Sequence, residues 1–193
     1  MARPREFERE DVIAKALGVF WRKGYQATSV QDLVDATRLN RGSLYDTFGD
    51  KHGLFLEAVR HYRRNITAQR LARLEEPGNA RRRIAAFFDD MVEFSVGEGR
   101  LLGCLMTNSA IELAPHDRDT RLAVAGGMAA TEAAFRRVLK RARKNGEISA
   151  DKSPSDLARF FTTTANGLRV LAKVQPDQAA LRAAVRVALT VLD

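Results

Sequence analysis

Cysteine, histidine and long apolar runs are all scarce in this sequence, and each scarcity excludes a class of protein. The single cysteine, Cys104, excludes an intramolecular disulfide and a zinc site made of several cysteines. No apolar run approaches the roughly 18 residues of a membrane span. The first eleven residues are mostly charged, unlike a signal peptide. We therefore expect a cytoplasmic protein with no membrane partner.

Catalytic signatures are equally sparse. The three histidines, His52, His61 and His116, are scattered, and no HExxH, GxSxG or P-loop pattern occurs. Asp89 and Asp90 are neighbours, so on a helix their side chains diverge and make a poor acid–base pair. We therefore expect neither an enzyme nor a bound metal or cofactor.

The chain does have ordinary hydrophobicity and an excess of positive charge. Its 45% hydrophobic and 29% charged residues are typical of a soluble globular protein. A chain of this length buries about 70% of its unfolded surface, so it needs no covalent cross-links. The 32 lysines and arginines outnumber the 24 acidic residues, giving a net charge of +8. This excess favours a polyanionic partner such as nucleic acid or an acidic membrane surface.

Apolar residues recur at helical spacing along almost the whole chain, and strand patterns are absent. Glycine, proline and capping residues divide this pattern into about nine helices, so the expected fold class is all-α. The expected helices lie around 12–20, 30–34, 41–47, 51–74, 80–96, 101–113, 117–145, 154–173 and 181–192.

The first three helices, all within the first 50 residues, match a helix-turn-helix module. Its recognition helix must be short and small or polar on the face that enters a DNA groove about 12 Å wide. Arg41, Ser43 and Thr47 supply that face, while Leu44 and Phe48 point inward. Gly42 lets the backbone approach DNA closely, and the Tyr45 hydroxyl suits a phosphate oxygen.

A dense string of about 30 residues carries a family resemblance. It comprises Gly24-Tyr25, Thr28 to Leu33, Asn40 to Tyr45, Phe48, Lys51 and Leu54. On these residues the sequence resembles the TetR (tetracycline-repressor) family of bacterial transcriptional regulators. The resemblance implies phosphate contacts from Thr28, Tyr45 and Lys51, and base or backbone contacts from Arg41, Gly42 and Ser43.

The candidate DNA-binding set adds helix caps to these contacts. It consists of Thr28, Ser29, Asn40, Arg41, Gly42, Ser43, Tyr45, Thr47 and Lys51.

Two positions depart from the family pattern. Arg38 stands where a turn glycine is usual, so either a non-glycine residue adopts positive φ or the turn differs. Thr47 stands where histidine is common. Arg3 and Arg5 are candidates for a basic arm in the minor groove, although such tails are more often disordered.

We expect residues 1–50 to form the DNA-binding domain and residues 51–193 an effector-binding and dimerisation domain, connected by the helix 51–74. Bulky, adaptable side chains are concentrated in the second domain, where they line a ligand cavity or simply fill a helical core. The resemblance favours a cavity for a small-molecule effector. The candidate pocket residues are Phe87, Phe88, Met91, Phe94, Cys104, Thr107, Asn108, Met128, Phe135, Phe160 and Phe161.

The last two expected helices carry small residues such as Ala165, Gly167 and Ala172, which allow close helix approach. The resemblance implies that these helices pair with their symmetry mates in a homodimer. The candidate interface residues are Leu168, Leu171, Leu181, Ala184, Val185 and Ala188. The basic run from Arg136 to Lys144 is interpreted as a solvated face at a helix C-terminus.

The predicted function is that of a ligand-responsive repressor, released from a pseudo-palindromic double-stranded DNA operator by a small-molecule effector. The alternatives are an activator of the same fold and an architectural DNA-binding protein without an effector. Cys104 is open to two interpretations. It is a small buried hydrophobe, or it is a sensor of electrophiles or oxidants. In the second case a helix N-terminus and Lys173 favour its thiolate.

Overall fold

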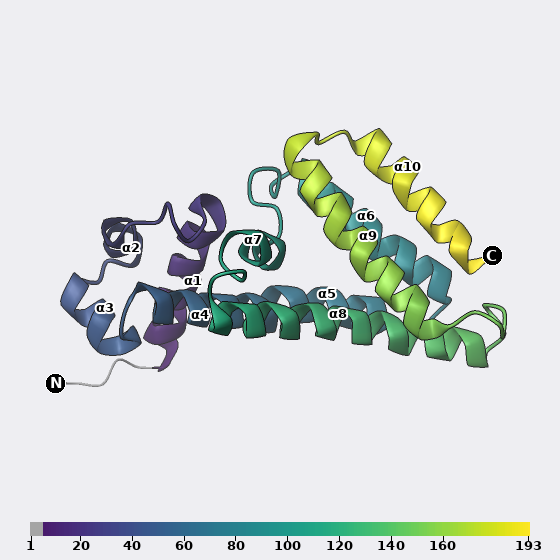
Figure 1. Cartoon of the computed structure of the whole chain (residues 1–193), viewed down its shortest axis with the longest axis horizontal. Coiled ribbons are helices and arrows are strands. Elements are labelled where there is room, and N and C mark those ends of the chain that lie inside the picture. Colours follow the sequence, from purple (N-terminus) through teal and green to yellow (C-terminus); the bar gives the residue numbers. More distant parts are fainter. Residues whose placement is uncertain (1–5) are drawn as a thin grey trace.

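The computed structural model describes residues 6–193, which form helices joined by short turns (Figure 1). Within that range no strand occurs, which confirms the expected all-α class. Arg3 and Arg5, the candidate minor-groove arm, lie outside the described residues. No helix among residues 6–193 combines the length and apolarity needed to cross a bilayer.

The N-terminal module consists of α1 (Glu6–Lys23), α2 (Val30–Thr37) and α3 (Arg41–Phe48). Gly24 ends α1 with a φ of 81°, a conformation that favours glycine. Ser29 and Asp32 form the predicted capping box at the start of α2. Arg38 ends α2 with a φ of 63°, so the family's usual turn is kept with a non-glycine residue in the left-handed region.

One continuous rod connects the module to the rest of the chain. It consists of α4 (Lys51–Tyr62), the π-helical turn η1 (Arg63–Thr67) and α5 (Ala68–Glu75). The predicted helix 51–74 has the correct extent but lacks this turn. With the rod counted once, residues 6–193 contain nine α-helices, as the sequence predicts, followed by a short 3-10 turn, η2 (Thr190–Leu192).

The remaining helices are α6 (Ala80–Val96), α7 (Leu105–Glu112), α8 (Arg118–Lys144), α9 (Pro154–Val174) and α10 (Gln178–Leu189). Helix α8 runs beside the rod, and α10 packs on α6 (Figure 1). The helix expected at 101–113 begins only at Leu105. Gly103 has a φ of 63°, and a Cβ on Gly99 would lie 2.2 Å from the Phe94 ring, so these two glycines hold turns in place of a helix.

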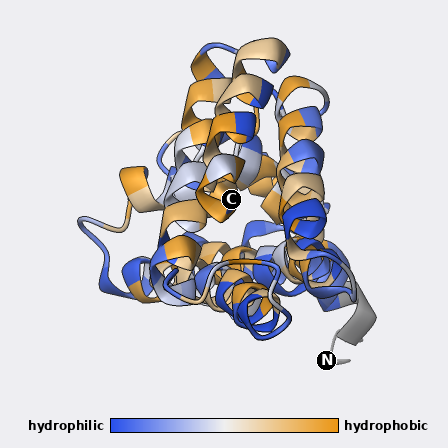
Figure 2. Ribbon diagram, turned by 90° about the vertical axis from the view of Figure 1, so that its right-hand side faces the viewer, coloured by the Kyte–Doolittle hydropathy of each residue, from blue (hydrophilic) through white to orange (hydrophobic). Residues whose placement is uncertain are grey.

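Two apolar cores lie among the described residues. The first joins the N-terminal module to α4 and α7, and includes Leu44, Phe55 and Leu105. The second lies between α6, α8, α9 and α10, and includes Phe88 and Phe135. Figure 2 shows hydrophobic and hydrophilic segments alternating along these helices, as expected where each buries one face. Because the first core extends into α7, that helix is packed directly against the N-terminal module.

Candidate functional site

The N-terminal turn of α3 presents polar groups at the surface. The Asn40 side-chain oxygen accepts a hydrogen bond from the Ser43 backbone N–H at 2.8 Å, which caps the helix. Arg41 and Gly42 are exposed, and the Arg41 guanidinium lies 5.2 Å from the centre of the Tyr45 ring. Leu44 is buried, as predicted. The helix is therefore fixed by its inner face and leaves Arg41 and the Gly42 backbone accessible.

The other candidate residues of this helix are more enclosed. Ser43 and Thr47 are half-buried, and the Thr47 hydroxyl donates to the Ser43 carbonyl oxygen at 2.8 Å within the helix. A Cβ at Gly42 would lie 3.3 Å from the capping oxygen of Asn40, so a side chain there would crowd the cap. The small size of Gly42 thus preserves both the cap and access to the backbone.

The starts of α2 and α4 flank this surface. Ser29 is exposed at the start of α2. Lys51 opens α4 with its ammonium 4.4 Å from the centre of the Tyr25 ring, and partial burial lowers the pKa of Lys51. Thr28 departs from expectation: it is only 1% exposed, and its hydroxyl donates to the Gly24 carbonyl oxygen at 2.5 Å. In this conformation Thr28 closes the turn after α1 and does not offer its hydroxyl to a phosphate.

A second set of contacts joins the N-terminal module to α7, and sequence reasoning missed it. The Glu112 carboxylate accepts hydrogen bonds from the backbone N–H of Tyr25 at 3.1 Å and of Gln26 at 2.8 Å. The Trp21 indole N–H donates to the Gly103 carbonyl oxygen at 3.2 Å. These partners are more than 80 residues apart along the chain, so no local pattern signals them. Both ends of α7 are therefore attached to the α1–α2 region.

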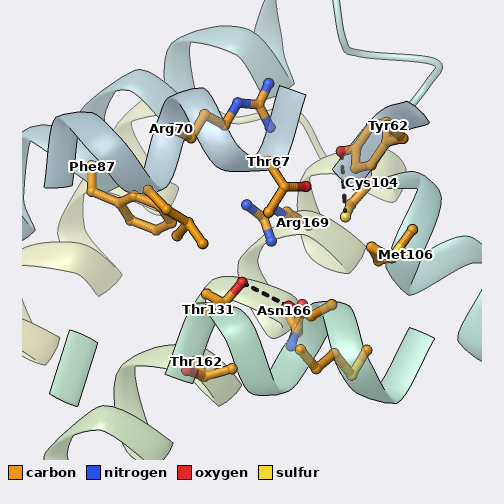
Figure 3. Close-up of a pocket in the computed structure, with 13 residues that line it drawn as sticks. Tyr62, Thr67, Arg70, Phe87, Cys104, Met106, Thr131, Thr162, Asn166 and Arg169 are labelled. Carbon is orange, nitrogen blue, oxygen red and sulfur yellow. Dashed lines mark hydrogen bonds between the residues drawn. The ribbon is translucent and has the colours of Figure 1, made fainter. Parts of the chain in front are cut away.

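An inner cavity lies between the rod and helices α6 to α9 (Figure 3). The space between its walls is about 450 Å³ including the mouth, and much of it is too narrow for a water molecule. Three of the candidate pocket residues, Phe87, Cys104 and Met128, line it. The full lining consists of Tyr62, Thr67, Arg70, Leu71, Phe87, Cys104, Met106, Gly127, Met128, Thr131, Thr162, Asn166 and Arg169.

The other candidate pocket residues lie elsewhere. Phe88, Phe135 and Phe161 pack against one another in the second core, and none of them lines the inner cavity. Met91 borders a separate surface groove, and Phe160 is 40% exposed on the outer side of α9. Aromatic residues at helical spacing fill the core here, because the helix faces that carry them meet one another.

Three further candidates next to this region have structural partners. The Phe94 ring stacks on Trp21 with centroids 5.8 Å apart. The Thr107 hydroxyl donates to the Asn166 side-chain oxygen at 3.2 Å, and the Asn108 amide donates to the Leu102 carbonyl oxygen at 2.8 Å. Thr107 and Asn108 line a surface groove on the other side of Cys104 from the inner cavity.

The polar lining of the cavity was visible in the sequence but was not selected. Thr162, Asn166 and Arg169 are spaced i, i+4, i+7 and so share one face of α9. Thr67 and Arg70 share a face of the rod in the same way. A polar stripe on a helix whose other residues are largely apolar or small is the signal that could have identified this wall.

Cys104 lies at the N-cap of α7, buried between the cavity and the surface groove. Its sulfur accepts a hydrogen bond from the Tyr62 hydroxyl at 3.6 Å (Figure 3). Burial by itself would raise the pKa of Cys104. The positive charge of Arg169, a hydrogen bond from the Thr107 backbone N–H and the one from Tyr62 outweigh it, so the pKa lies below its usual value.

Lys173, the expected partner of this thiol, has a different contact. Its ammonium donates to the Asn108 side-chain oxygen at 3.4 Å on the exposed side of α9. Arg169, one helical turn earlier, is the cation whose charge lowers the pKa of Cys104. The expectation of a cation near the thiol was correct in kind, but the residue is Arg169.

Most of the candidate dimer residues face inward. Leu168, Leu181 and Val185 belong to the second core, and Ala188 is buried beside them. Leu171 is 56% exposed and Ala184 is exposed. The reason is that the apolar stripe of α10 packs on α6 of the same chain.

An outward apolar face nevertheless remains on the last two helices. Val174 is 78% exposed on α9 and Val187 is 69% exposed on α10. Together with Leu171 and Ala184 they form what we call the outer face of α9 and α10.

Comparisons with known proteins agree with this architecture. Residues 12–58 match the family model of bacterial regulatory proteins of the tetR family, and residues 80–188 match that of a tetracyclin repressor-like C-terminal domain. The HTH-type transcriptional regulator YezE of Bacillus subtilis (strain 168) is 38% identical over 100% of both chains. The HTH-type transcriptional repressor ComR of Escherichia coli (strain K12) is 29% identical over 98% of this chain and 90% of its own.

A solved structure resembles the chain over its full length. It contains a cysteine variant of the TetR family transcriptional regulator CifR with 26-base-pair double-stranded operator DNA. It superimposes with a TM-score of 0.87 at 31% identity, covering 100% of each chain.

Proposed function

This chain belongs to the TetR family of bacterial transcriptional regulators, and from that premise we propose that it is a ligand-released repressor acting as a homodimer in the cytoplasm. The observation that carries the proposal is the exposed, capped N-terminal turn of α3, with Arg41 and the Gly42 backbone at the surface. ComR, a relative, is named as a repressor, and CifR was solved with operator DNA.

In the proposed complex, α3 enters the major groove and the starts of α2 and α4 contact the flanking phosphates. Arg41 reads a base, Tyr45 and Lys51 bind phosphate oxygens, and Ser29 and Asn40 hold the helix starts in register. A two-fold dimer presents two such helices, so its operator is a pseudo-palindrome with half-sites about one helical turn, ~34–36 Å, or somewhat more apart.

The dimer forms through the outer face of α9 and α10. Its exposed Leu171, Val174, Ala184 and Val187 offer apolar surface that a second copy covers. Because the inward residues Leu168, Leu181 and Val185 support these helices from the core, they shape the interface without being part of it.

The effector binds in the inner cavity and alters the spacing of the two recognition helices. The cavity is narrow, so an occupant separates its walls, which include η1 of the rod and the start of α7. A π-helical turn inside an α-helix often marks a functional site, and here it lies between the DNA end and the effector end of the rod. Glu112 carries the displacement of α7 to the turn before α2. Ligand binding thus shifts a population from operator-competent to operator-incompetent dimers.

A covalent change at Cys104 provides a second way to displace α7. The lowered pKa of Cys104 increases the fraction of thiolate, which is the nucleophilic form. An electrophile that forms a bond to the sulfur adds bulk at the N-cap of α7 and breaks the hydrogen bond from Tyr62. The observation that favours this role over simple packing is the group of hydrogen-bond donors and the cation around the sulfur.

Operator binding by designed variants tests the DNA-binding surface. The operator is first selected from random-sequence DNA, and affinity is measured by fluorescence anisotropy over a range of salt concentrations. Arg41→Ala is expected to relax sequence preference at one position of each half-site. Lys51→Ala is expected to weaken binding to all sequences alike and to flatten the salt slope by about one for each phosphate that the variant no longer neutralises.

The control variant is Arg82→Ala, which removes an exposed arginine of α6 far from α3 and leaves the net charge equal to that of Arg41→Ala. If Arg41→Ala and Arg82→Ala bind the operator with the same affinity and specificity, the assignment of α3 as recognition helix is wrong. An effector-independent architectural protein would bind DNA in the same way but show no ligand-induced release or thermal shift.

A further inference from the structure

Arg169, described so far only as the cation near the Cys104 sulfur, also lines the inner cavity. Figure 3 shows its guanidinium in the middle of the lining residues, between Thr67 of the rod and Thr131 of α8. No aspartate or glutamate of residues 9–193 lines the cavity, and Arg169 forms no ion pair with any residue of that range. Arg70, the other cation of the lining, has its guanidinium 4.7 Å from the centre of the Phe94 ring.

A half-buried guanidinium without a counter-ion is unfavourable, because part of its hydration is lost and nothing replaces it. A guanidinium also has five N–H donors in a planar arrangement that matches the two oxygens of a carboxylate. The cavity therefore has an unmet requirement for a negatively charged group at Arg169.

The groups around Arg169 add to this requirement. Asn166 also lines the cavity, and its side-chain oxygen accepts a hydrogen bond from Thr107, so its amide N–H groups are the donors that it has left. The hydroxyl of Thr67 also lines it. Phe87, Met106 and Met128 contribute apolar side chains to the wall. Donors at one position and apolar atoms beside them fit a molecule with an anionic head and a short apolar part.

The approach to the cavity carries the same charge preference. The surface groove beyond Cys104 is lined by Arg22, Lys23 and Lys173 as well as by Arg169. Glu112, its acidic residue, has both carboxylate oxygens engaged by backbone N–H groups. Arg169 and Cys104 line both spaces and separate them. A positive groove raises the local concentration of anions at this entrance.

We propose that the effector is a small organic anion, a monocarboxylate with a short apolar tail, whose carboxylate pairs with Arg169 while the tail lies against Phe87, Met106 and Met128. The inference rests on the proposed function, because it names the ligand class of the same cavity. The competing explanation is that Arg169 serves only the Cys104 sulfur, and the test separates the two.

The test compares carboxylates with their neutral amides on the full-length protein bound to its operator. Butyrate, hexanoate and benzoate are matched with butyramide, hexanamide and benzamide at constant ionic strength. The thermal midpoint of the protein and the release of labelled operator are recorded. We expect at least one carboxylate to raise the midpoint and release the operator, and its amide to need about tenfold or more concentration for the same effect, because a charge-assisted hydrogen bond is missing.

Variants of Arg169 test whether its positive charge causes the preference for carboxylates over amides. Arg169→Gln is expected to remove the preference for the carboxylate, and Arg169→Lys to retain part of it, since lysine keeps the charge but not the paired donors. Arg82→Gln, on exposed α6, is the matched control and responds like the parent protein. Cys104→Ser separates the two explanations for Arg169, because it removes the thiol and leaves the guanidinium in place.

Several results would overturn the inference. The first is that the amides act at the same concentrations as the carboxylates. The second is that Arg169→Gln or Arg169→Lys prefers the carboxylate as strongly as the parent protein does. The third is that no carboxylate raises the thermal midpoint or releases the operator from a protein that binds it. In all of these the DNA-binding regulator stands and only the ligand class is wrong. A response that disappears in Cys104→Ser but persists in Arg169→Gln would assign Arg169 to the thiol alone. Failure of the unliganded protein to select an operator would instead contradict the proposed function.

Discussion

Glu112 is the residue whose removal most directly tests how α7 communicates with the DNA-binding module. Its carboxylate accepts the backbone N–H of Tyr25, which is partly buried, and of Gln26, which is exposed. Hydrogen bonds to a charged group contribute about 1.5–3 kcal/mol each, and an exposed one contributes less because water replaces it. Glu112→Ala is therefore expected to lower the free energy of unfolding by about 2 kcal/mol.

The chain offers a matched control in Glu147. Its carboxylate accepts the backbone N–H of Ala80 at 2.7 Å and the side-chain amide of Asn79 at 3.1 Å, so it ties a helix start to a distant loop as Glu112 does. The Glu147 carboxylate also accepts the side-chain amide of Asn145 at 3.3 Å, at the end of α8, and all three partners lie far from α3. Glu147→Ala is expected to cost a similar free energy of unfolding without changing the N-terminal module.

Two measurements separate stability from communication. Urea unfolding gives the free energy, and anisotropy gives operator affinity in conditions where both variants are folded. We expect operator affinity to fall in Glu112→Ala and to remain at the parent value in Glu147→Ala. Amide hydrogen exchange at Tyr25 and Gln26 is expected to accelerate only in Glu112→Ala. Equal operator affinities and equal exchange in the two variants would refute the role of α7.

Three further predictions concern other parts of the structure. Hydrogen bonds from Lys23 and Ser29 lower the pKa of Asp32 to about 2, so its contribution to stability is present above pH ~4 and is lost as the pH falls toward 2. An NMR titration of Asp32 checks this, and Lys23→Gln should move its pKa upward. Leu171→Glu should convert the dimer to monomers in sedimentation and abolish operator binding. Cys104→Ser should bind operator like the parent but resist release by iodoacetamide, which mass spectrometry can relate to alkylation of the lone cysteine.

The helices were predictable because their limits depend on local chemistry. Ser29 and Asn40 cap the helices that follow them, and Gly24 ends α1, as short-range hydrogen bonding and backbone freedom require. The helix that was expected to start at 101 starts instead at Leu105, because Gly103 adopts a left-handed conformation that the apolar spacing does not reveal.

The cavity was only partly predictable because burial on a helix face does not say what that face meets. Phe88 and Phe161 satisfy the pattern of pocket residues and of core residues equally well, and the packing of α6 on α9 decides between them. Arg169 carried a clearer signal through its spacing from Thr162 and Asn166. The link from Glu112 to Tyr25 had no local signal, since it depends on how distant helices meet.

The candidate interface residues include buried and exposed side chains for the same reason. An amphipathic helix has one apolar stripe that the sequence reveals, and α10 uses it on α6 of its own chain. The exposed Val187, on the opposite side, breaks the pattern and indicates surface available to a second copy.

Selection of operator DNA from a random library tests the central claim most directly. The claim is that two copies of α3, held by a dimer, read a two-fold symmetric site. The parent protein is predicted to enrich a pseudo-palindrome whose half-sites lie about one helical turn or somewhat more apart, and Arg41→Ala to lose one base preference in each half. An enriched motif without two-fold symmetry, or the same motif from the parent and from Arg41→Ala, would contradict the account.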